Sequence, residues 1–169
     1  MTASPVTTPP PGAPIPVPDP SVLNDASLRK ASTSSACFGC GADHPGGLKL
    51  QRTGYDGTAA TGHIEITDQH QGVPGFAHGG LLATAMDEIT GTVSWLLGKK
   101  SVTGRLETDF RLPVPVGSTL HVRAWCTGVE GRKIYLEGEG RIDSPDGPLA
   151  VRAAALFIQI PPDHFASAS

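Results

Sequence analysis

The spacing of apolar positions changes once along the chain, and that change predicts one long helix. Between residues 79 and 97, apolar residues recur every three or four positions and fall on a single stripe at about 100° per residue. The stripe consists of Leu82, Ala85, Met86, Ile89, Val93 and Leu96. We therefore predict an amphipathic helix over residues 79–97 that buries one face.

Alternation of apolar and polar positions predicts strands on both sides of this helix. Two strands precede it, and they are joined by Asp56-Gly57, a dipeptide typical of tight hairpins. Four strands follow it, separated by segments rich in glycine and proline. The predicted ranges are 48–55, 58–67, 101–112, 118–128, 132–142 and 148–160. This order favours an α+β fold, with one helix on an antiparallel sheet of about six strands.

Composition separates the two ends of the chain from this domain. The chain has 169 residues and 16 prolines, and eight of the prolines lie in the first 20 positions. Such a segment buries too little apolar surface to offset its ordering entropy. We therefore expect a flexible N-terminal segment over residues 1–36 whose first 20 residues are dispensable for activity. A short piece, SVLNDASLRK at 21–30, has an amphipathic pattern compatible with a helix. The folded domain is expected over 37–161, with a C-terminal tail at 162–169.

Net charge and the distribution of apolar residues argue against several classes of partner and location. The formal net charge is −3, so charge gives no support for nucleic-acid binding. No apolar run approaches the roughly 20 residues of a membrane helix. The first residues lack the basic and apolar regions of a secretory signal. We expect a cytoplasmic protein with neither nucleic-acid nor membrane partners.

The glycine-rich run at 72–80 leads directly into the predicted helix. A helix start leaves backbone N–H groups unpaired and carries a partial positive charge, and glycines there allow close approach of another molecule. Such an end can hold an anion or a developing oxyanion. A turn that needs glycine only for its backbone angles explains the same residues. Asp87 follows His78 by nine residues, about 13 Å along the helix. The alternative for Asp87 is a solvated acidic pair with Glu88.

Three further candidate ligands lie close together before the first strand. Cys37, Cys40 and His44 carry soft donor atoms, but a closed zinc site needs four ligands. A redox dithiol is expected at a strand-to-helix junction, which this segment is not. The third cysteine, Cys126, leaves an odd number, which does not favour a disulfide framework. We predict buried thiols in a turn and no metal.

Two motifs resemble those of one known family. The run QGVPGFAHGG at 71–80, followed by one long helix and then strands, resembles the hotdog-fold acyl-CoA thioesterases. The branch it is most similar to is the PaaI-type group with its mammalian THEM relatives. The segment CFGCG at 37–41, with Pro45 and Gly47-Leu48 after it, also resembles many bacterial members. The resemblance covers about residues 37–160.

The resemblance implies a long helix wrapped by a curved antiparallel sheet, and a homodimer or dimer of dimers with sites at the subunit interface. The family's helix carboxylate falls on Asp87, and its backbone oxyanion donor falls on Gly80. A threonine that opens the next strand falls on Thr103, expected to reach the facing subunit's Asp87. The family's basic residue is displaced by one here, to Arg111. The pair Gly104-Arg105 also differs from the family's small polar pair.

The remaining motif residues receive supporting roles from the same resemblance. His78 forms the turn before the oxyanion donor and belongs with the catalytic group. Gly79, Gly72 and Phe76 are expected to contact substrate.

The activity implied is hydrolysis of an acyl-CoA to a carboxylic acid and coenzyme A. Asp87 would act as general base on water, or as a nucleophile that forms a mixed anhydride. No cofactor or metal is implied, because coenzyme A enters as part of the substrate. One alternative is a non-catalytic acyl-CoA-binding hotdog protein. Another is a hotdog enoyl-thioester hydratase, in which His78 would be the base.

Overall fold

The computed structural model describes residues 3–18, 34–56, 58–161 and 163–164. Its elements are β1 (Gln51–Tyr55), β2 (Ala59–Glu65), the single-turn 3-10 helix η2 (Asp68–His70), α2 (Gly79–Leu96), β3 (Ser101–Phe110), β4 (Thr119–Glu130), β5 (Lys133–Ile142) and β6 (Leu149–Gln159). The piece at 21–30 lies outside the described residues, as does most of the tail predicted at 162–169. The bounds proposed for the folded domain stay a prediction.

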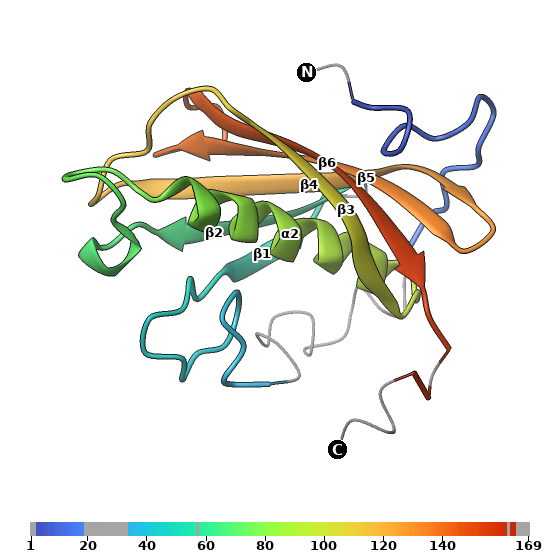
Figure 1. The fold of residues 1–169 in the computed structure, drawn as a ribbon, viewed down its shortest axis with the longest axis horizontal. Coiled ribbons are helices and arrows are strands. Elements are labelled where there is room, and N and C mark those ends of the chain that lie inside the picture. The colour runs from blue at the N-terminus through green and yellow to red at the C-terminus, as the bar shows by residue number, and fades with distance from the viewer. Residues whose placement is uncertain (1–2, 19–33, 57, 162, 165–169) are drawn as a thin grey trace.

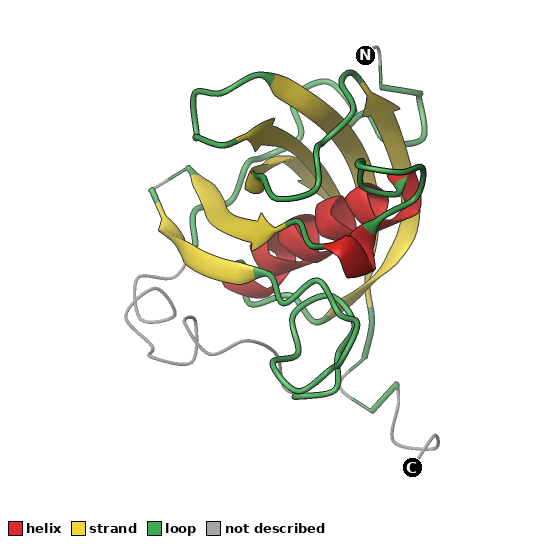
Figure 2. Ribbon diagram, turned by 90° about the vertical axis from the view of Figure 1, so that its left-hand side faces the viewer, coloured by secondary structure: helices red, strands yellow, loops and turns green. Residues whose placement is uncertain are grey.

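The six strands form one antiparallel sheet in the order β1-β2-β4-β5-β6-β3. Helix α2 lies across one face of this sheet (Figure 1). Viewed from the side, the sheet curls around the helix (Figure 2). The predicted fold is therefore confirmed: one long helix on a six-stranded antiparallel sheet. No helix in the described part of the chain has the length and hydropathy needed to cross a membrane.

The predicted apolar stripe of α2 forms the centre of the core. All six of its residues are at most 4% exposed, and each buried Leu, Ile or Met side chain contributes about 1.5–3 kcal/mol. Beneath the helix, β5 carries glycine at two successive inward positions, Gly138 and Gly140. A Cβ on Gly140 would lie 2.8 Å from Val151 and 3.4 Å from Met86. Glycine at this position therefore lets the helix and the neighbouring strand pack close to β5.

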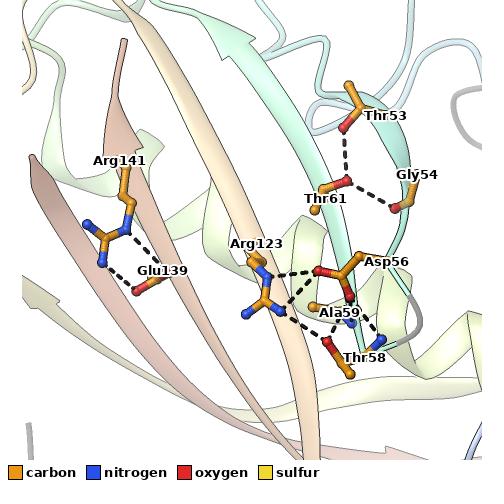
Figure 3. A network of polar contacts seen from close by, with 9 residues as sticks. All are labelled: Thr53, Gly54, Asp56, Thr58, Ala59, Thr61, Arg123, Glu139 and Arg141. Carbon is orange, nitrogen blue, oxygen red and sulfur yellow. Dashed lines mark hydrogen bonds and ion pairs between the residues drawn. The ribbon is translucent and has the colours of Figure 1, made fainter. Parts of the chain in front are cut away.

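The hairpin predicted at Asp56 is confirmed by the antiparallel pairing of β1 with β2. One Asp56 carboxylate oxygen accepts hydrogen bonds from the backbone amides of Thr58 and Ala59, at 2.9 and 2.8 Å. The other oxygen accepts from Arg123 on β4 at 3.1 Å (Figure 3). Asp56 therefore closes the turn and also ties it to the next strand of the sheet.

The N-terminal segment differs from our expectation of a free tail. The described residues 3–18 lie on the face of the sheet opposite to α2 (Figure 1). Glu107 on β3 accepts hydrogen bonds from the amide and hydroxyl of Ser4 and from the hydroxyl of Thr7. Thr7 is 1% exposed. A proline-rich composition predicts that this segment does not fold by itself. It does not predict the hydrogen-bond partners that the segment finds on the sheet.

A second set of contacts holds the same segment over β4. The Val129 amide donates to the carbonyl of Pro14 at 2.9 Å. A Cβ on Gly128 would approach Pro9 to 2.8 Å, so glycine is needed where the segment crosses the strand. Leu156 alternates with core residues along β6 and so faces this outer side, yet it is 9% exposed. The segment therefore lies against a sheet face that is partly apolar.

The docking of this segment should depend on pH through Glu107. Hydrogen bonds from Ser4 and then Thr7 lower the pKa of Glu107 from 4.5 to about 2. Because this pKa is lower in the folded state, the contact stabilises fully above about pH 4.5 and is lost as the pH falls toward 2. We expect Glu107→Gln to lower Tm at pH 7 by about 3–6 °C. Thermal melts should show that difference shrinking below pH 4.

The matched control for this prediction is Glu139→Gln. Glu139 lies on β5 and pairs with Arg141, two residues along the same strand. Its removal should change Tm less, and it should leave the N-terminal segment docked. Equal melting temperatures for wild type and Glu107→Gln at pH 7 would contradict the proposed role of the carboxylate.

Candidate active site

Hydrogen bonds within the loop before α2 hold it in one conformation. The Gly72 amide donates to the Phe76 carbonyl at 2.9 Å, and the Gly75 amide donates to the Gln71 side chain at 2.6 Å. Gly75 has a φ of +84°, a value that favours glycine. The His78 amide then donates to the carbonyl of the buried His70 at 2.8 Å. The start of α2 is therefore fixed in position before any ligand binds.

His78 caps the helix, and this cap involves the residue expected to be the oxyanion donor. Its Nδ1 accepts a hydrogen bond from the Gly80 amide at 3.0 Å, so the N–H expected to be the oxyanion donor already has a partner. Gly79 is the first residue of the helix, and its amide has no intrahelical partner. A Cβ on Gly72 would lie 3.0 Å from the His78 Cα. Gly72 therefore makes room for the capping residue.

An aromatic ring from β3 lies against the start of the helix. A Cβ on Gly79 would meet the Phe110 ring at 3.6 Å, an ordinary contact. Phe110 is 53% exposed, and Phe76, in the loop that leads into the helix, is 37% exposed. Sequence reasoning placed Phe76 here but missed Phe110, because β3 and the helix start meet only in the folded chain. Exposed apolar side chains beside a helix end are typical of a contact surface.

The two polar residues expected at the centre of the site are in contact. The Thr103 hydroxyl donates a hydrogen bond to Asp87 Oδ1 at 2.7 Å. This contact lies within one chain, and the expected contact of Thr103 with the facing subunit's Asp87 stays a prediction. Among the described residues, the Thr103 hydroxyl bonds Oδ1 of Asp87 and leaves Oδ2 without a hydrogen bond.

A β-bulge explains why Thr103 faces the helix. In the pairing of β3 with β6, Thr103 lies opposite Phe157 and Arg105 lies opposite Leu156, with Gly104 as the extra residue. Phe157 belongs to the core cluster, so Thr103 is on the helix side. An extra residue reverses the alternation of a strand and so re-aims a side chain. Simple period-two alternation counted from the core-packed Leu106 would have placed Thr103 on the outer face.

Glu88 has different surroundings from Asp87. Arg52 on β1 donates to Glu88 Oε1 at 2.7 Å and to the Thr92 hydroxyl at 2.9 Å. The Arg52 and Glu88 side chains are 17% and 19% exposed. Glu88 therefore belongs to a largely buried ion pair between the helix and the edge strand, and the two carboxylates do not form one solvated pair.

Comparisons with known proteins agree with this fold. Residues 74–148 match the profile of the thioesterase superfamily. The acyl-coenzyme A thioesterase THEM4 of Xenopus laevis is 35% identical over 92 residues, which is 54% of this chain and 41% of that protein. A crystal structure of a thioesterase superfamily protein has a TM-score of 0.69 at 25% identity, over 88% of this chain and 69% of that one.

A further solved structure, a hypothetical thioesterase from Streptococcus pneumoniae TIGR4 with coenzyme A, has a TM-score of 0.61 at 17% identity. It covers 66% of this chain and 85% of that chain, and it supports the fold alone.

One helix wrapped by a curved antiparallel sheet, with a carboxylate on the helix and glycines at its start, defines a hotdog protein. Residues 74–148 match the thioesterase superfamily, the family that the motifs of the chain resemble. The chain spans about two fifths of the length of the curated THEM4 relative that it matches.

The different surroundings of the two carboxylates predict different effects on stability. Glu88→Gln removes the charge opposite the largely buried Arg52 guanidinium, and it should lower the free energy of unfolding by about 1–3 kcal/mol. Asp87→Asn keeps an acceptor oxygen for the Thr103 hydroxyl, so its effect should be under about 0.5 kcal/mol. Urea unfolding of the two variants tests both values. A larger loss for Asp87→Asn than for Glu88→Gln would contradict this assignment.

Proposed function

We propose that the chain is an acyl-CoA thioesterase in which Asp87 is the catalytic carboxylate. The observation that carries this proposal is the hydrogen bond from the Thr103 hydroxyl to Asp87 Oδ1, at 2.7 Å. It orients a carboxylate beside a helix whose first amide, on Gly79, has no intrahelical partner. The name of the THEM4 relative and the coenzyme A bound by the Streptococcus pneumoniae neighbour support acyl-CoA as the substrate.

One chain alone does not bring these groups to the same carbonyl. Gly79 and Asp87 are eight residues apart, about 12 Å along the helix. A two-fold axis beside the helices would run them antiparallel, so that Gly79 of one copy approaches Asp87 of the other. Strand β3 lies at one edge of the sheet, and sheet edges are usually paired or protected. We therefore propose a homodimer, alone or within a dimer of dimers, with two composite sites.

The proposed reaction is acyl transfer to water. The Gly79 amide donates to the thioester carbonyl oxygen and stabilises the negative charge that develops there. Asp87 Oδ2 accepts a proton from water while the water oxygen attacks the carbonyl carbon. The C–S bond then breaks, and the thiolate of coenzyme A takes up the proton. Asp87 acting as a nucleophile, through a mixed anhydride, would give the same products.

The geometry also bears on the two alternatives. A hydratase with His78 as the base would need the unprotonated ring nitrogen to be free, whereas in the neutral ring that nitrogen is Nδ1, which accepts from the Gly80 amide. A non-catalytic binding protein has no need of an oriented carboxylate. Release of free thiol from a panel of acyl-CoA and aryl-CoA substrates separates hydrolysis from binding, and an enoyl-CoA hydration assay tests the hydratase.

Loss of either proposed group should abolish turnover without unfolding the chain. Asp87→Asn should lower kcat by about 10²–10⁴-fold. Gly79→Pro removes the backbone N–H and adds a ring whose Cβ would meet Phe110 at an ordinary 3.6 Å, and it should lower kcat by about 10²–10³-fold. Proline is favoured at the first helical position, and His78 already has the φ of −68° and ψ of 133° that a residue before proline adopts. Gly79→Ala, which keeps the N–H, is the matched control.

Mixing the two inactive variants tests whether the site is shared between subunits. Half of the dimers would pair one Asp87→Asn chain with one Gly79→Pro chain, and each mixed dimer would contain one intact site. About a quarter of the wild-type activity should therefore return. Light scattering should give twice the chain mass, or four times. Full activity of Asp87→Asn alone would overturn the proposed function, while absence of recovery on mixing would overturn only the shared site.

Thr103→Val tests the orienting hydroxyl. Valine keeps the branched shape and the strand propensity of threonine but has no hydroxyl. Loss of one positioned hydrogen bond in the transition state should lower kcat by about 5- to 150-fold with a smaller change in KM. If Thr103 only satisfies local structure, the variant would melt at a lower temperature with kcat unchanged. Steady-state kinetics and a thermal melt on the same sample distinguish the two results.

A further inference from the structure

A second cluster of reactive side chains lies on another side of α2, and the proposed reaction does not use it. The thiols of Cys37 and Cys40 and a carboxylate oxygen of Glu88 all lie within 4.8 Å of one another. Cys40 is 2% exposed, and the other two residues are half-buried. The sequence offered only the two thiols and His44 as ligands here. The third member of the cluster comes from a helix about fifty residues further along the chain.

The loop that carries the two thiols packs closely against the Glu88 carboxylate. The Gly41 amide donates to the Cys37 carbonyl at 2.8 Å, and the Leu50 amide donates to the Gly39 carbonyl at 3.0 Å. A Cβ on Gly39 would overlap Glu88 Oε2, and a Cβ on Gly41 would overlap the backbone of Cys37. Both glycines are therefore required by the close fit of the loop. The thiols and the carboxylate are brought together by the fold and not by chance rotation of exposed side chains.

The carboxylate is held by one oxygen and presented by the other. Arg52 donates to Oε1 of Glu88 at 2.7 Å, while Oε2 lies 4.0 Å from the Cys37 sulfur. Zinc bound to thiolates at about 2.3 Å and to a carboxylate at about 2.0 Å needs ligand atoms at roughly this separation. Metal-binding carboxylates are commonly held by a hydrogen bond at their outer oxygen. Arg52 provides that contact here.

We propose that Cys37, Cys40 and Glu88 bind one zinc ion, with a water molecule as the fourth ligand. Two thiolates and one carboxylate carry three negative charges, and zinc with the Arg52 guanidinium carries three positive charges. Sulfur-rich ligand sets select zinc over magnesium or calcium, which prefer oxygen. The site would fasten the loop at 37–48 to α2 and to β1.

His44 lies outside this cluster. Its ring packs edge-on against Phe38, with the ring centroids 5.1 Å apart. In the absence of a cation, burial and then the Glu88 carboxylate raise the pKa of Cys40 to about 12. A bound cation favours the thiolate instead, and zinc binding should therefore release protons.

The test uses the full chain, reduced and stripped of metal, and titrated with cobalt(II) chloride as a spectroscopic probe. One equivalent of Co²⁺ should produce thiolate-to-cobalt charge-transfer absorption, and zinc chloride should abolish it. Cys37→Ser and Cys40→Ser should each weaken zinc binding at least about 100-fold, and Glu88→Gln about 10- to 100-fold while keeping the thiolate absorption. Cys126→Ser is the matched control, because this buried cysteine lies in the core cluster and should leave both signals unchanged.

X-ray absorption of the zinc-loaded wild type supports the proposal without any variant if it counts two sulfur ligands. Circular dichroism of each variant separates loss of a ligand from loss of fold. A wild type with three titratable thiols and no cobalt–thiolate absorption would overturn the proposal. So would zinc without sulfur neighbours, or cobalt absorption that survives unchanged in Cys40→Ser.

Discussion

The burial of one stripe of α2 against the concave face of the sheet determines where every other feature lies. Met86 and Ile89, at the centre of that stripe, are fully buried, and each must remain so for the helix to keep its rotation. Because an α-helix turns by about 100° per residue, the residue after Met86 is carried to the border of the buried face. Asp87 is therefore half-buried, close enough to β3 for Thr103 to reach it.

The same arrangement leaves one side of the helix uncovered. Six strands curl around α2 (Figure 2) but they do not close, and both β1 and β3 are edges. The helix start, with Gly79 and the exposed Phe110 beside it, lies at this open side. The proposed chemistry therefore depends on what covers the open side.

The elements that follow from local pattern were predictable, and those that depend on distant partners were not. The stripe of α2 and the hairpin at Asp56 are encoded in neighbouring residues, so periodicity and turn chemistry were sufficient. The bulge at Gly104 is defined by pairing with β6, about fifty residues away, and a single glycine in a strand does not reveal it. The docking of residues 3–18 depends on Glu107, a residue on a distant strand, so it cannot be predicted from the composition of the segment itself. The capping of Gly80 by His78 depends on a side-chain rotamer.

Two adjacent carboxylates on α2 have different roles: Asp87 is the proposed catalytic group, and Glu88 holds the helix against an edge strand. Asp87 projects toward Thr103 on one edge strand, and Glu88 projects toward Arg52 on the other. The pair of contacts fixes α2 from both sides, because rotation that improved one would weaken the other. The Arg52–Glu88 ion pair is largely buried, so it resists such rotation more strongly than the exposed Thr103 contact does. The position of Asp87 is thus set in part by Arg52 on β1, on the far side of its own helix, which the proposed reaction does not use.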